Sequence, residues 1–267
     1  DVNIDTSSRN KAAVSVTGEG DTNIKLNGDN ALKSDIYRSG IYGSGSLTIS
    51  GGENDSLTAQ GGAGGSGIHI SRNGSLTISG GTVTANGGNG DYSGGDGISS
   101  SDRVAISGST VTANGGDSSS RNGGSGISSS SGVTISGGTV TANGGNGDYS
   151  GGDGISSSDR VAISGSTVTA NGGDSSSRNG GSGISSSSGV TVSGGTVNAN
   201  GGDGDYRGGD GISSNDIDLS GSLELTAKAG KGTQSNGKAL SQNGNELDLN
   251  AIKDKLGPGA KVTATDA

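Results

Sequence analysis

The chain has 267 residues, of which 59 are Gly and one is Pro, and it contains no Cys, Met, Trp or Phe. Only 25% of the residues are hydrophobic, which excludes an ordinary globular core of large apolar side chains. The formal net charge of −9 argues against nucleic acid or an anionic membrane as a partner, because both need a basic surface, and it permits cations such as calcium.

Residues 1–38 carry irregular strand-like segments at 14–16 and 24–26, and we expect them to form an N-terminal cap with the first irregular coils. No apolar run approaches the ~18–20 residues that span a bilayer, so we expect no membrane span in this segment. Because the chain begins at Asp1 and shows no initiator Met, we expect it to be a processed piece of a longer protein.

Residues 39–235 are dominated by internal repetition. Residues 77–134 recur without a change at 134–191, an offset of 57 residues that contains coils of 29 and 28 residues. Disordered Gly-rich chains do not repeat aliphatic positions in fixed register, so the repeat predicts order. One aliphatic residue marks the same place in successive coils: Ile98, Ile127, Ile155, Ile184 and Ile212.

Each coil holds three short stretches in which apolar and polar residues alternate, the pattern of a β-strand. In the third stretch Val111 and Ala113 point one way, while Thr110 and Thr112 point the other. Ser-Gly corners and a longer Asn-Gly-Gly loop separate the stretches. The pattern predicts an all-β parallel β-helix (β-solenoid), with three short strands per coil of about 28 residues stacked at ~4.8 Å, in the right-handed form. An antiparallel sandwich is the alternative, but it does not explain identical residues once per coil.

Residues 236–267 differ from the repeats, as the end of a solenoid must. Leu249, Ile252 and Leu256 have helical spacing and precede Gly257 and Pro258, which predicts a C-terminal cap with a short helix.

An Asn occupies one repeated place, and stacked amides can hydrogen-bond along the axis of a solenoid. We interpret this row as a structural ladder rather than a catalytic group. Its members are Asn86, Asn114, Asn143, Asn171 and Asn200.

Pairs of Asp recur in the long loop of alternate coils. Carboxylate oxygens on Gly-rich turns suit calcium, so calcium is the candidate cofactor, although the spacing is not that of calcium-binding β-roll repeats. The alternative is solvated Asp residues that favour turns. The candidate metal ligands are Asp91, Asp96, Asp148, Asp153, Asp205 and Asp210.

Three Tyr residues in the same loop, Tyr92, Tyr149 and Tyr206, are also 57 residues apart. Two coils separate them by ~9.6 Å along the axis, close to the disaccharide repeat of an extended glycan. A row of exposed rings can stack on sugar faces, so these residues are candidate ligands for a polysaccharide. The alternative is that each Tyr folds over its own loop.

A Thr-x-Thr pair recurs on the outward face of the third strand. Flat arrays of this kind resemble the ice-binding faces of some insect antifreeze solenoids, whereas Thr is also an ordinary exposed strand residue. The candidate residues are Thr110, Thr112, Thr139, Thr141, Thr167 and Thr169.

Catalysis is not expected. His69 is the single histidine, and the chain has no Cys to complete a triad or a zinc site with it, so we interpret it as a surface residue of an early coil. Candidate acidic and basic residues are duplicated with the coils, whereas chemistry is usually performed at one unique site. Duplication therefore favours a surface property.

The segments at 45–51 and 74–85, with Asp-Gly-Ile at 96–98, 153–155 and 210–212, resemble the carbohydrate-binding-domain β-helix proteins of Firmicutes, whose structural relatives are pectate lyases. This resemblance implies a protein that is secreted or attached to the bacterial cell surface and that binds calcium and acidic or plant-type polysaccharides. The near-perfect duplication departs from that group and is more typical of a repetitive surface adhesin.

The sequence therefore predicts a non-catalytic, adhesin-like extracellular surface protein that binds polysaccharide or host glycan along a repetitive face. The first alternative is a structural stalk or filament segment in which the coils are spacers, and the second is an ice-binding protein.

Overall fold

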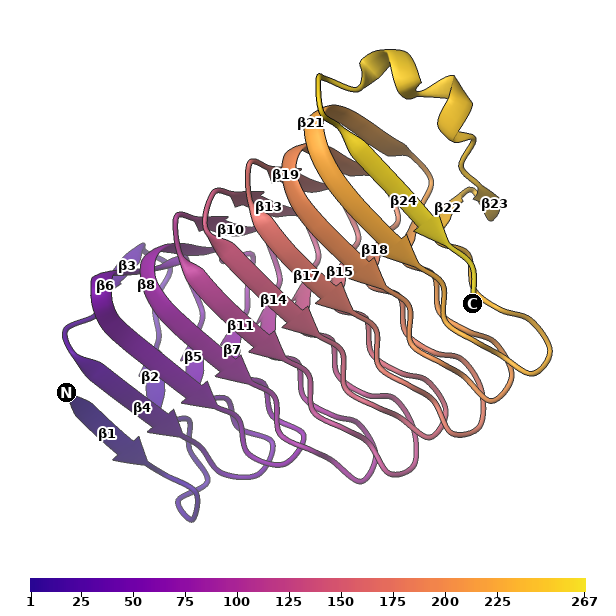
Figure 1. Ribbon diagram of the computed structural model, residues 1–267. Helices are drawn as coiled ribbons and strands as arrows, with labels where there is room; N and C mark the ends of the chain where they lie inside the picture. The colour runs from indigo at the N-terminus through magenta and orange to yellow at the C-terminus, as the bar shows by residue number, and fades with distance from the viewer.

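The computed structural model describes all residues from 1 to 267. The chain winds into a rod of stacked parallel coils, with its two ends at opposite ends of the rod (Figure 1). Strands of successive coils pair in one sheet of 14 strands and one of 10 strands. This arrangement confirms the predicted parallel β-solenoid.

A central coil shows the plan of the whole rod. It consists of β9 (Ile98–Ser100), β10 (Val104–Ser107) and β11 (Thr110–Asn114), followed by a loop that leads to β12 (Ile127–Ser129) of the next coil. The buried and exposed residues alternate along β11 as the sequence predicts, with Val111 and Ala113 inside and Thr110 exposed. Three short strands per coil are therefore confirmed in the middle coils.

The smaller sheet stacks one strand from each coil. The marker isoleucines stand directly above one another, because Ile127 pairs with both Ile98 and Ile155. The column continues to Ile184 and Ile212. Besides β9 and β12, its strands are β2 (Val14–Val16), β5 (Ile41–Gly43), β7 (Ile68–Ile70), β15 (Ile155–Ser157), β18 (Ile184–Ser186), β20 (Ile212–Ser214), β22 (Leu240–Gln242) and the antiparallel β23 (Asn245–Glu246).

The larger sheet covers the other two faces of the rod. In the middle coils a Ser-Gly corner breaks each turn into two strands, as at Gly108, whose φ is 58°. At other coils a single strand continues round the corner. The broken coils contribute β13 (Val133–Ser136), β14 (Thr139–Asn143), β16 (Val161–Ser164) and β17 (Thr167–Asn171), and the continuous strands are β6 (Leu47–Gln60), β8 (Leu76–Asn86), β19 (Val190–Asn200) and β21 (Ile217–Lys228).

The two ends are built differently. At the N-terminal end β1 (Val2–Asp5), β3 (Thr22–Lys25) and β4 (Asp29–Lys33) already pair in parallel within the solenoid. At the C-terminal end two 3-10 turns, η1 (Leu249–Ala251) and η2 (Lys253–Lys255), place Ile252 against the core, and β24 (Lys261–Thr265) pairs with β21. The residues with helical spacing thus form single turns, and the domain boundaries remain predictions.

Aliphatic columns fill the interior. The inward side chains of one coil are each at most 1% exposed, and they belong to one core cluster of 42 residues. The interior is filled by Ile, Leu, Val and Ala alone, so the core forms without Phe, Trp or Met. The residues in this coil are Ile98, Val104, Ile106, Val111 and Ala113.

The long loop of each coil is held closed by glycines. The amide of Gly124 donates to the carbonyl of Gly116 at 2.8 Å, and the amide of Gly145 in the next coil donates to Gly124 at 2.7 Å. A Cβ atom on Gly145 would lie 2.0 Å from the carbonyl oxygen of Gly116, so no larger residue fits. We call this line the glycine seam; its members are Gly65, Gly88, Gly95, Gly116, Gly124, Gly145, Gly152, Gly173, Gly181, Gly202, Gly209, Gly230 and Gly237.

Candidate functional site

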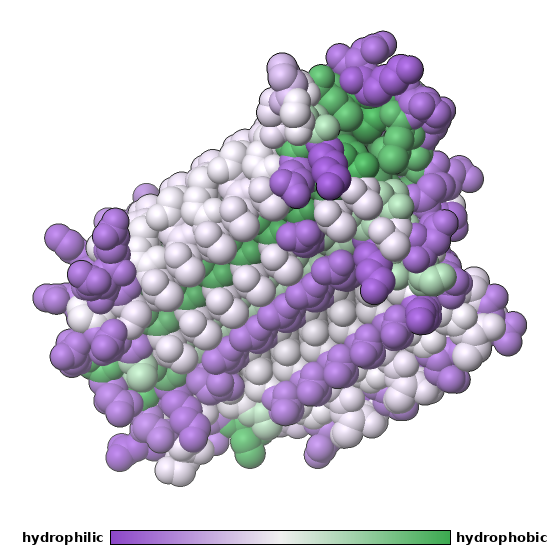
Figure 2. All heavy atoms as spheres, in the orientation of Figure 1, coloured by the Kyte–Doolittle hydropathy of each residue, from purple (hydrophilic) through white to green (hydrophobic).

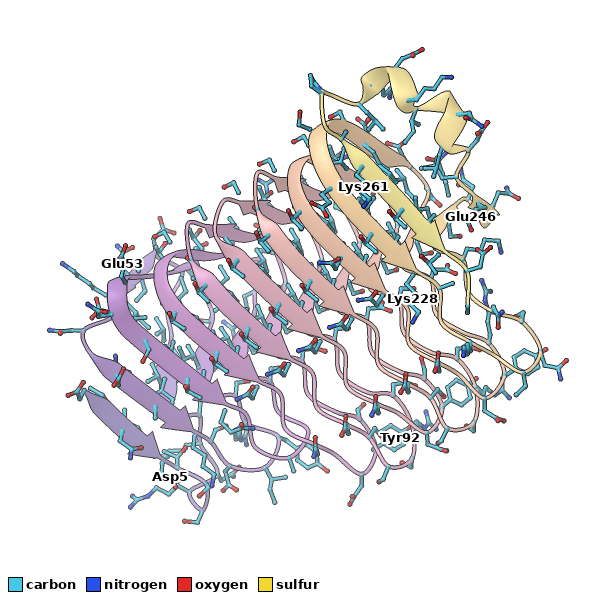
Figure 3. All side chains as sticks on the ribbon, viewed as in Figure 1. Asp5, Glu53, Tyr92, Lys228, Glu246 and Lys261 are labelled. Carbon is cyan, nitrogen blue, oxygen red and sulfur yellow. The ribbon has the colours of Figure 1, made fainter.

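The glycine seam flattens the loops into a row of aligned projections along one edge of the rod, which we call the loop edge (residues 87–96 and their equivalents in later coils; Figure 1). Tyr92 lies on this edge (Figure 3). The seam therefore converts a flexible, Gly-rich sequence into a rigid surface on which side chains repeat coil by coil.

A ladder of side-chain oxygens runs along the loop edge. The Asn89 side chain accepts from the amide of Asp117 at 2.8 Å, and Asp117 accepts from the amide of Asn146 at 2.7 Å. The same bond continues through Asp174 and Asp203 to Lys231. Figure 2 shows hydrophilic residues in lines parallel to the axis of the rod. Alternation of Asn with Asp halves the density of negative charge along most of this ladder.

The predicted Asn ladder is confirmed as a structural element. Each amide nitrogen donates to the side-chain oxygen of the preceding Asn at 2.8 Å, for example from Asn114 to Asn86 and from Asn143 to Asn114. The bonds continue to Asn171 and Asn200. Because each amide uses its polar atoms within the ladder, these residues stabilise the stacking.

The tyrosines do not form an uninterrupted row, because an arginine stands between each pair. The guanidinium carbon of Arg121 lies 4.3 Å from the ring centre of Tyr92, and that of Arg178 lies 4.7 Å from the ring centre of Tyr149. We call this line the Tyr–Arg column: Tyr92, Arg121, Tyr149, Arg178 and Tyr206. Sequence reasoning missed the arginines, although Arg121 follows Tyr92 by one coil length of 29 residues.

The column changes what the rings can offer a ligand. Tyr92, Tyr149 and Tyr206 remain 48–59% exposed, so about half of each side chain is accessible to a ligand. A guanidinium covers one face of Tyr92 and one face of Tyr149, and cation–π contact of this kind stabilises the stack by about 0.5–1 kcal/mol at an exposed site. The column therefore offers ring edges, hydroxyls and guanidinium groups as well as free aromatic faces.

The candidate metal ligands separate into an outer and an inner set. Asp96, Asp153 and Asp210 form the inner set, and each accepts the backbone amide of the next coil at 2.8 Å. Asp153 keeps part of its surface exposed, but its carboxyl group is enclosed deeply enough that burial raises its pKa to about 6, and burial raises the pKa of Asp96 to about 6 as well.

Asp91, Asp148 and Asp205 form the outer set. Asp148 lines a shallow hollow of about 360 Å³ together with Asp174 of the next coil, and Asp91 lines an equivalent hollow with Asp117. Asp153 and Asp96 line neither hollow. No group of three or more His, Cys, Asp or Glu side chains converges anywhere in the chain. The calcium assignment remains a prediction.

The predicted Thr-x-Thr residues form two columns in register on the outward face of the larger sheet. Thr139 pairs with Thr110 and Thr167, and Thr141 pairs with Thr112 and Thr169. The first column is exposed and the second half-buried. The regularity ends at Asn198, which stands beside Thr169 in the next coil.

Comparison with known proteins identifies the repeat. A family model described as a beta helix repeat matches residues 76–102, 133–159 and 190–216. Together with the parallel stacking, these matches show that the chain contains β-helix repeats. No curated protein matches the chain, and no solved structure matches it. None of its helices has the length and apolar character needed to cross a membrane.

Proposed function

We propose that the chain is a non-catalytic, adhesin-like extracellular surface protein that holds a polysaccharide along its loop edge. The Tyr–Arg column carries this proposal. It places an aromatic ring every two coils, or about 9.6 Å, and a guanidinium group halfway between, at a spacing that follows two sugar units of an extended glycan.

The chemistry of the column suits a glycan with acidic groups. Arginine binds carboxylate or sulfate through two parallel hydrogen bonds, and the exposed rings supply apolar contact to sugar faces. Asp148 and the Ser side chains beside the column, such as Ser176 at 2.7 Å from the Asp148 carboxylate, supply further groups for hydroxyls or for a bridging cation.

Repetition supports a surface role rather than catalysis. The residues of the column, both Asp sets and the hollows all recur at the 57-residue offset, so any ligand contact is made several times. Weak contacts made in parallel add by avidity, because the second contact is intramolecular once the first has formed.

The experiment compares chains of different length. Deleting residues 77–133 joins identical sequences and preserves the register of the coils, and duplicating the same unit lengthens the rod. Retention on an acidic polysaccharide such as polygalacturonate, with and without calcium, is then measured by affinity electrophoresis. We expect retention to increase with each unit. Equal retention for all three lengths would instead identify the coils as spacers of a stalk.

Point variants locate the contact. The double variant Arg121→Ala and Arg178→Ala removes both guanidinium groups of the column, and we expect it to lose retention on the acidic polysaccharide. High salt screens the same charges, so we expect it to lower the retention of the wild type in the same way. Arg103→Ala is the matched control, because Arg103 is exposed on a different corner of the rod. If no acidic or β-linked glycan is retained by the wild type, the proposal is wrong.

The threonine columns support ice binding as a second candidate. Threonines two residues apart along a strand are about 6.6 Å apart and those in neighbouring strands about 4.8 Å apart, so the face presents a regular grid of methyl and hydroxyl groups. Thermal hysteresis at high protein concentration tests this candidate. Its absence excludes ice binding and leaves the glycan proposal intact.

A further inference from the structure

The first coils carry a groove that the repeats lack. Two hollows, of about 400 Å³ and 520 Å³, lie on either side of Tyr42, and volumes of this size are typical of small-ligand sites. Glu19 and Arg72 line the first hollow, and Lys11 and Arg38 line the second. We call the two hollows together the Tyr42 groove. Unlike the loop edge, it occurs once.

The middle residues of the strands in the smaller sheet form one column, and the rungs at Tyr42 and His69 differ from the rest of it. Seven of its nine rungs are serine, and only Tyr42 and His69, which are adjacent, carry rings. The two rings stack, with centres 5.9 Å apart and planes at 26°. Ser15 precedes Tyr42 in the column, so the face of the Tyr42 ring toward the N-terminal end meets only a small side chain. Tyr42 and His69 therefore form one surface of two stacked rings.

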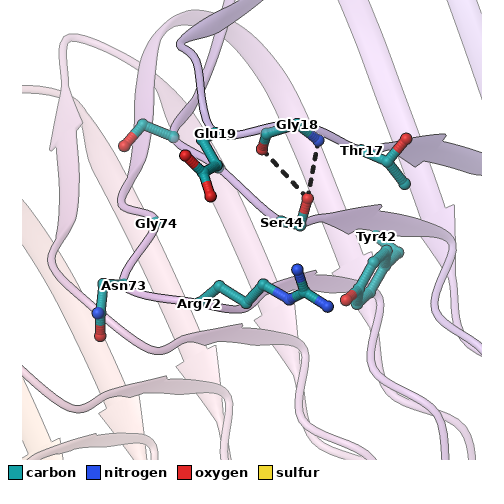
Figure 4. Close-up of a pocket in the computed structure, with 10 residues that line it drawn as sticks. Thr17, Gly18, Glu19, Tyr42, Ser44, Arg72, Asn73 and Gly74 are labelled. Carbon is teal, nitrogen blue, oxygen red and sulfur yellow. Dashed lines mark hydrogen bonds between the residues drawn. The ribbon is translucent and has the colours of Figure 1, made fainter.

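Backbone strain concentrates in the same place. Five residues other than Gly have a positive φ in the whole chain, and four of them, Asn10, Tyr37, Arg72 and Asn73, line the groove. Such conformations cost about 1–3 kcal/mol each and cluster at functional sites. The Arg72 side chain extends across the hollow, and its guanidinium group is directed toward Tyr42 (Figure 4).

The groove is cationic within an acidic protein. Lys11, Arg38 and Arg72 face one carboxylate, Glu19, while the whole chain has a net charge of −9. None of the three ion pairs of the chain involves these four residues. Arg38 donates to the side-chain oxygen of Asn10 at 2.9 Å. The Asp35 carboxylate accepts the backbone amide of Asn10 and attracts Arg38 electrostatically, but it lines neither hollow.

We propose that the Tyr42 groove binds one small, hydroxyl-rich carboxylate, a sugar acid, with its ring on Tyr42 and its carboxylate on Arg72 or Lys11. A flat aromatic face, several unpaired cations and a lining of Ser, Asn and Glu side chains match a ring that carries both hydroxyl groups and one negative charge. This site differs from the loop edge because it is not repeated and contains no residue of the Tyr–Arg column, although Tyr37 lines both the groove and the first hollow of the loop edge.

The test uses calorimetric titration of the full chain with glucuronate, glucose and glucosamine. We expect glucuronate to bind at one site per chain and at least about tenfold more tightly than glucose or glucosamine, a difference of about 1.4 kcal/mol. Equal binding of glucose, several sites per chain, or no binding of glucuronate would each overturn the assignment.

Two substitutions separate binding from folding. Tyr42→Ser introduces the residue that the column uses elsewhere, and Arg72→Asn keeps a residue that tolerates the left-handed backbone. We expect each to weaken glucuronate binding by at least about tenfold with little change in melting temperature. Lys261→Ala, at an exposed position of β24 near the C-terminal end of the rod, is the control and leaves this affinity unchanged. Unchanged affinity in both groove variants contradicts the proposal.

A final titration distinguishes a free sugar acid from the end of an acidic glycan chain. A tri-glucuronide is compared with the monosaccharide at the same groove. Tighter one-to-one binding of the trisaccharide that is lost with Tyr42→Ser indicates the end of an acidic glycan chain, and tighter binding of the monosaccharide indicates a free sugar acid. Either result supports the groove as a sugar-acid site.

Discussion

The stacked β-strands that enclose the core, which we call the prism, and the loop edge of this rod are equally regular, but different forces hold them together. The prism buries a continuous column of aliphatic side chains, such as Ile98, Ile127 and Ile155. The loop edge buries almost none, and it is held by glycine amides and by ladders of Asn and Asp. The difference shows that close backbone approach can order a segment whose composition alone predicts disorder.

A clash in the glycine seam is expected to destabilise the rod most strongly. Gly145→Ala places a Cβ atom 2.0 Å from a backbone oxygen of the preceding coil, so we expect a loss of about 4 kcal/mol or more, or failure to fold. Urea unfolding followed by circular dichroism measures it. Gly165→Ala, where only the positive φ of 57° is violated, is expected to cost about 1–2 kcal/mol. Gly20→Ala, with no atom within 4 Å, is the neutral control. Equal losses of unfolding free energy at the three positions would contradict the close backbone contact in the glycine seam.

A cavity in the prism comes next. Ile155 is fully buried, so Ile155→Ala is expected to cost about 2–5 kcal/mol through lost apolar contact and the remaining cavity. The same urea titration checks the value. The equivalent change at exposed Ile36, which is 57% exposed, serves as the control and is expected to have an effect within about 0.5 kcal/mol. A larger loss at Ile36 than at Ile155 would contradict the proposed core.

The Asn ladder is expected to contribute less. Asn143→Ala removes the two amide hydrogen bonds that join Asn143 to Asn114 and Asn171, and we expect a loss of about 1–3 kcal/mol. Asn179, which is exposed on the loop edge, provides the matched control. If both substitutions prove neutral, stacked amides do not stabilise the coils.

The smallest effect is a dependence on pH. Burial raises the pKa of Asp153 to about 6 from an ordinary value of 3.8, so the folded state holds this proton more tightly than the unfolded state. The stability that follows is fully present below about pH 4 and is lost as the pH rises through 6. We expect Asp153→Asn to reduce the fall in melting temperature between pH 4 and pH 6. Asp148→Asn is the control in the outer set. An identical pH profile in wild type and Asp153→Asn would contradict the burial of this carboxyl.

Much of the architecture follows from the repeat in the sequence. A fixed offset with alternating polar and apolar residues predicts strands stacked like on like, and the predicted columns of Ile127, Val111 and Asn114 are all present. The groups that lie side by side across coils were harder to predict. Arg121 stands between two tyrosines because loops of slightly different sequence stack in register, and that register emerges only when the glycine seam closes.

The repeat alone is enough to predict the parallel solenoid, its period and the identity of its interior columns, because each coil templates the next through the same strand pairing. Three features become visible only in the folded coils: the glycine seam orders the Gly-rich loops, Tyr and Arg alternate along one edge, and Tyr42 stacks on His69. The reason is that these contacts join residues about one coil apart in loops and early turns, where the sequences are not identical and the local pattern does not specify which side chains meet.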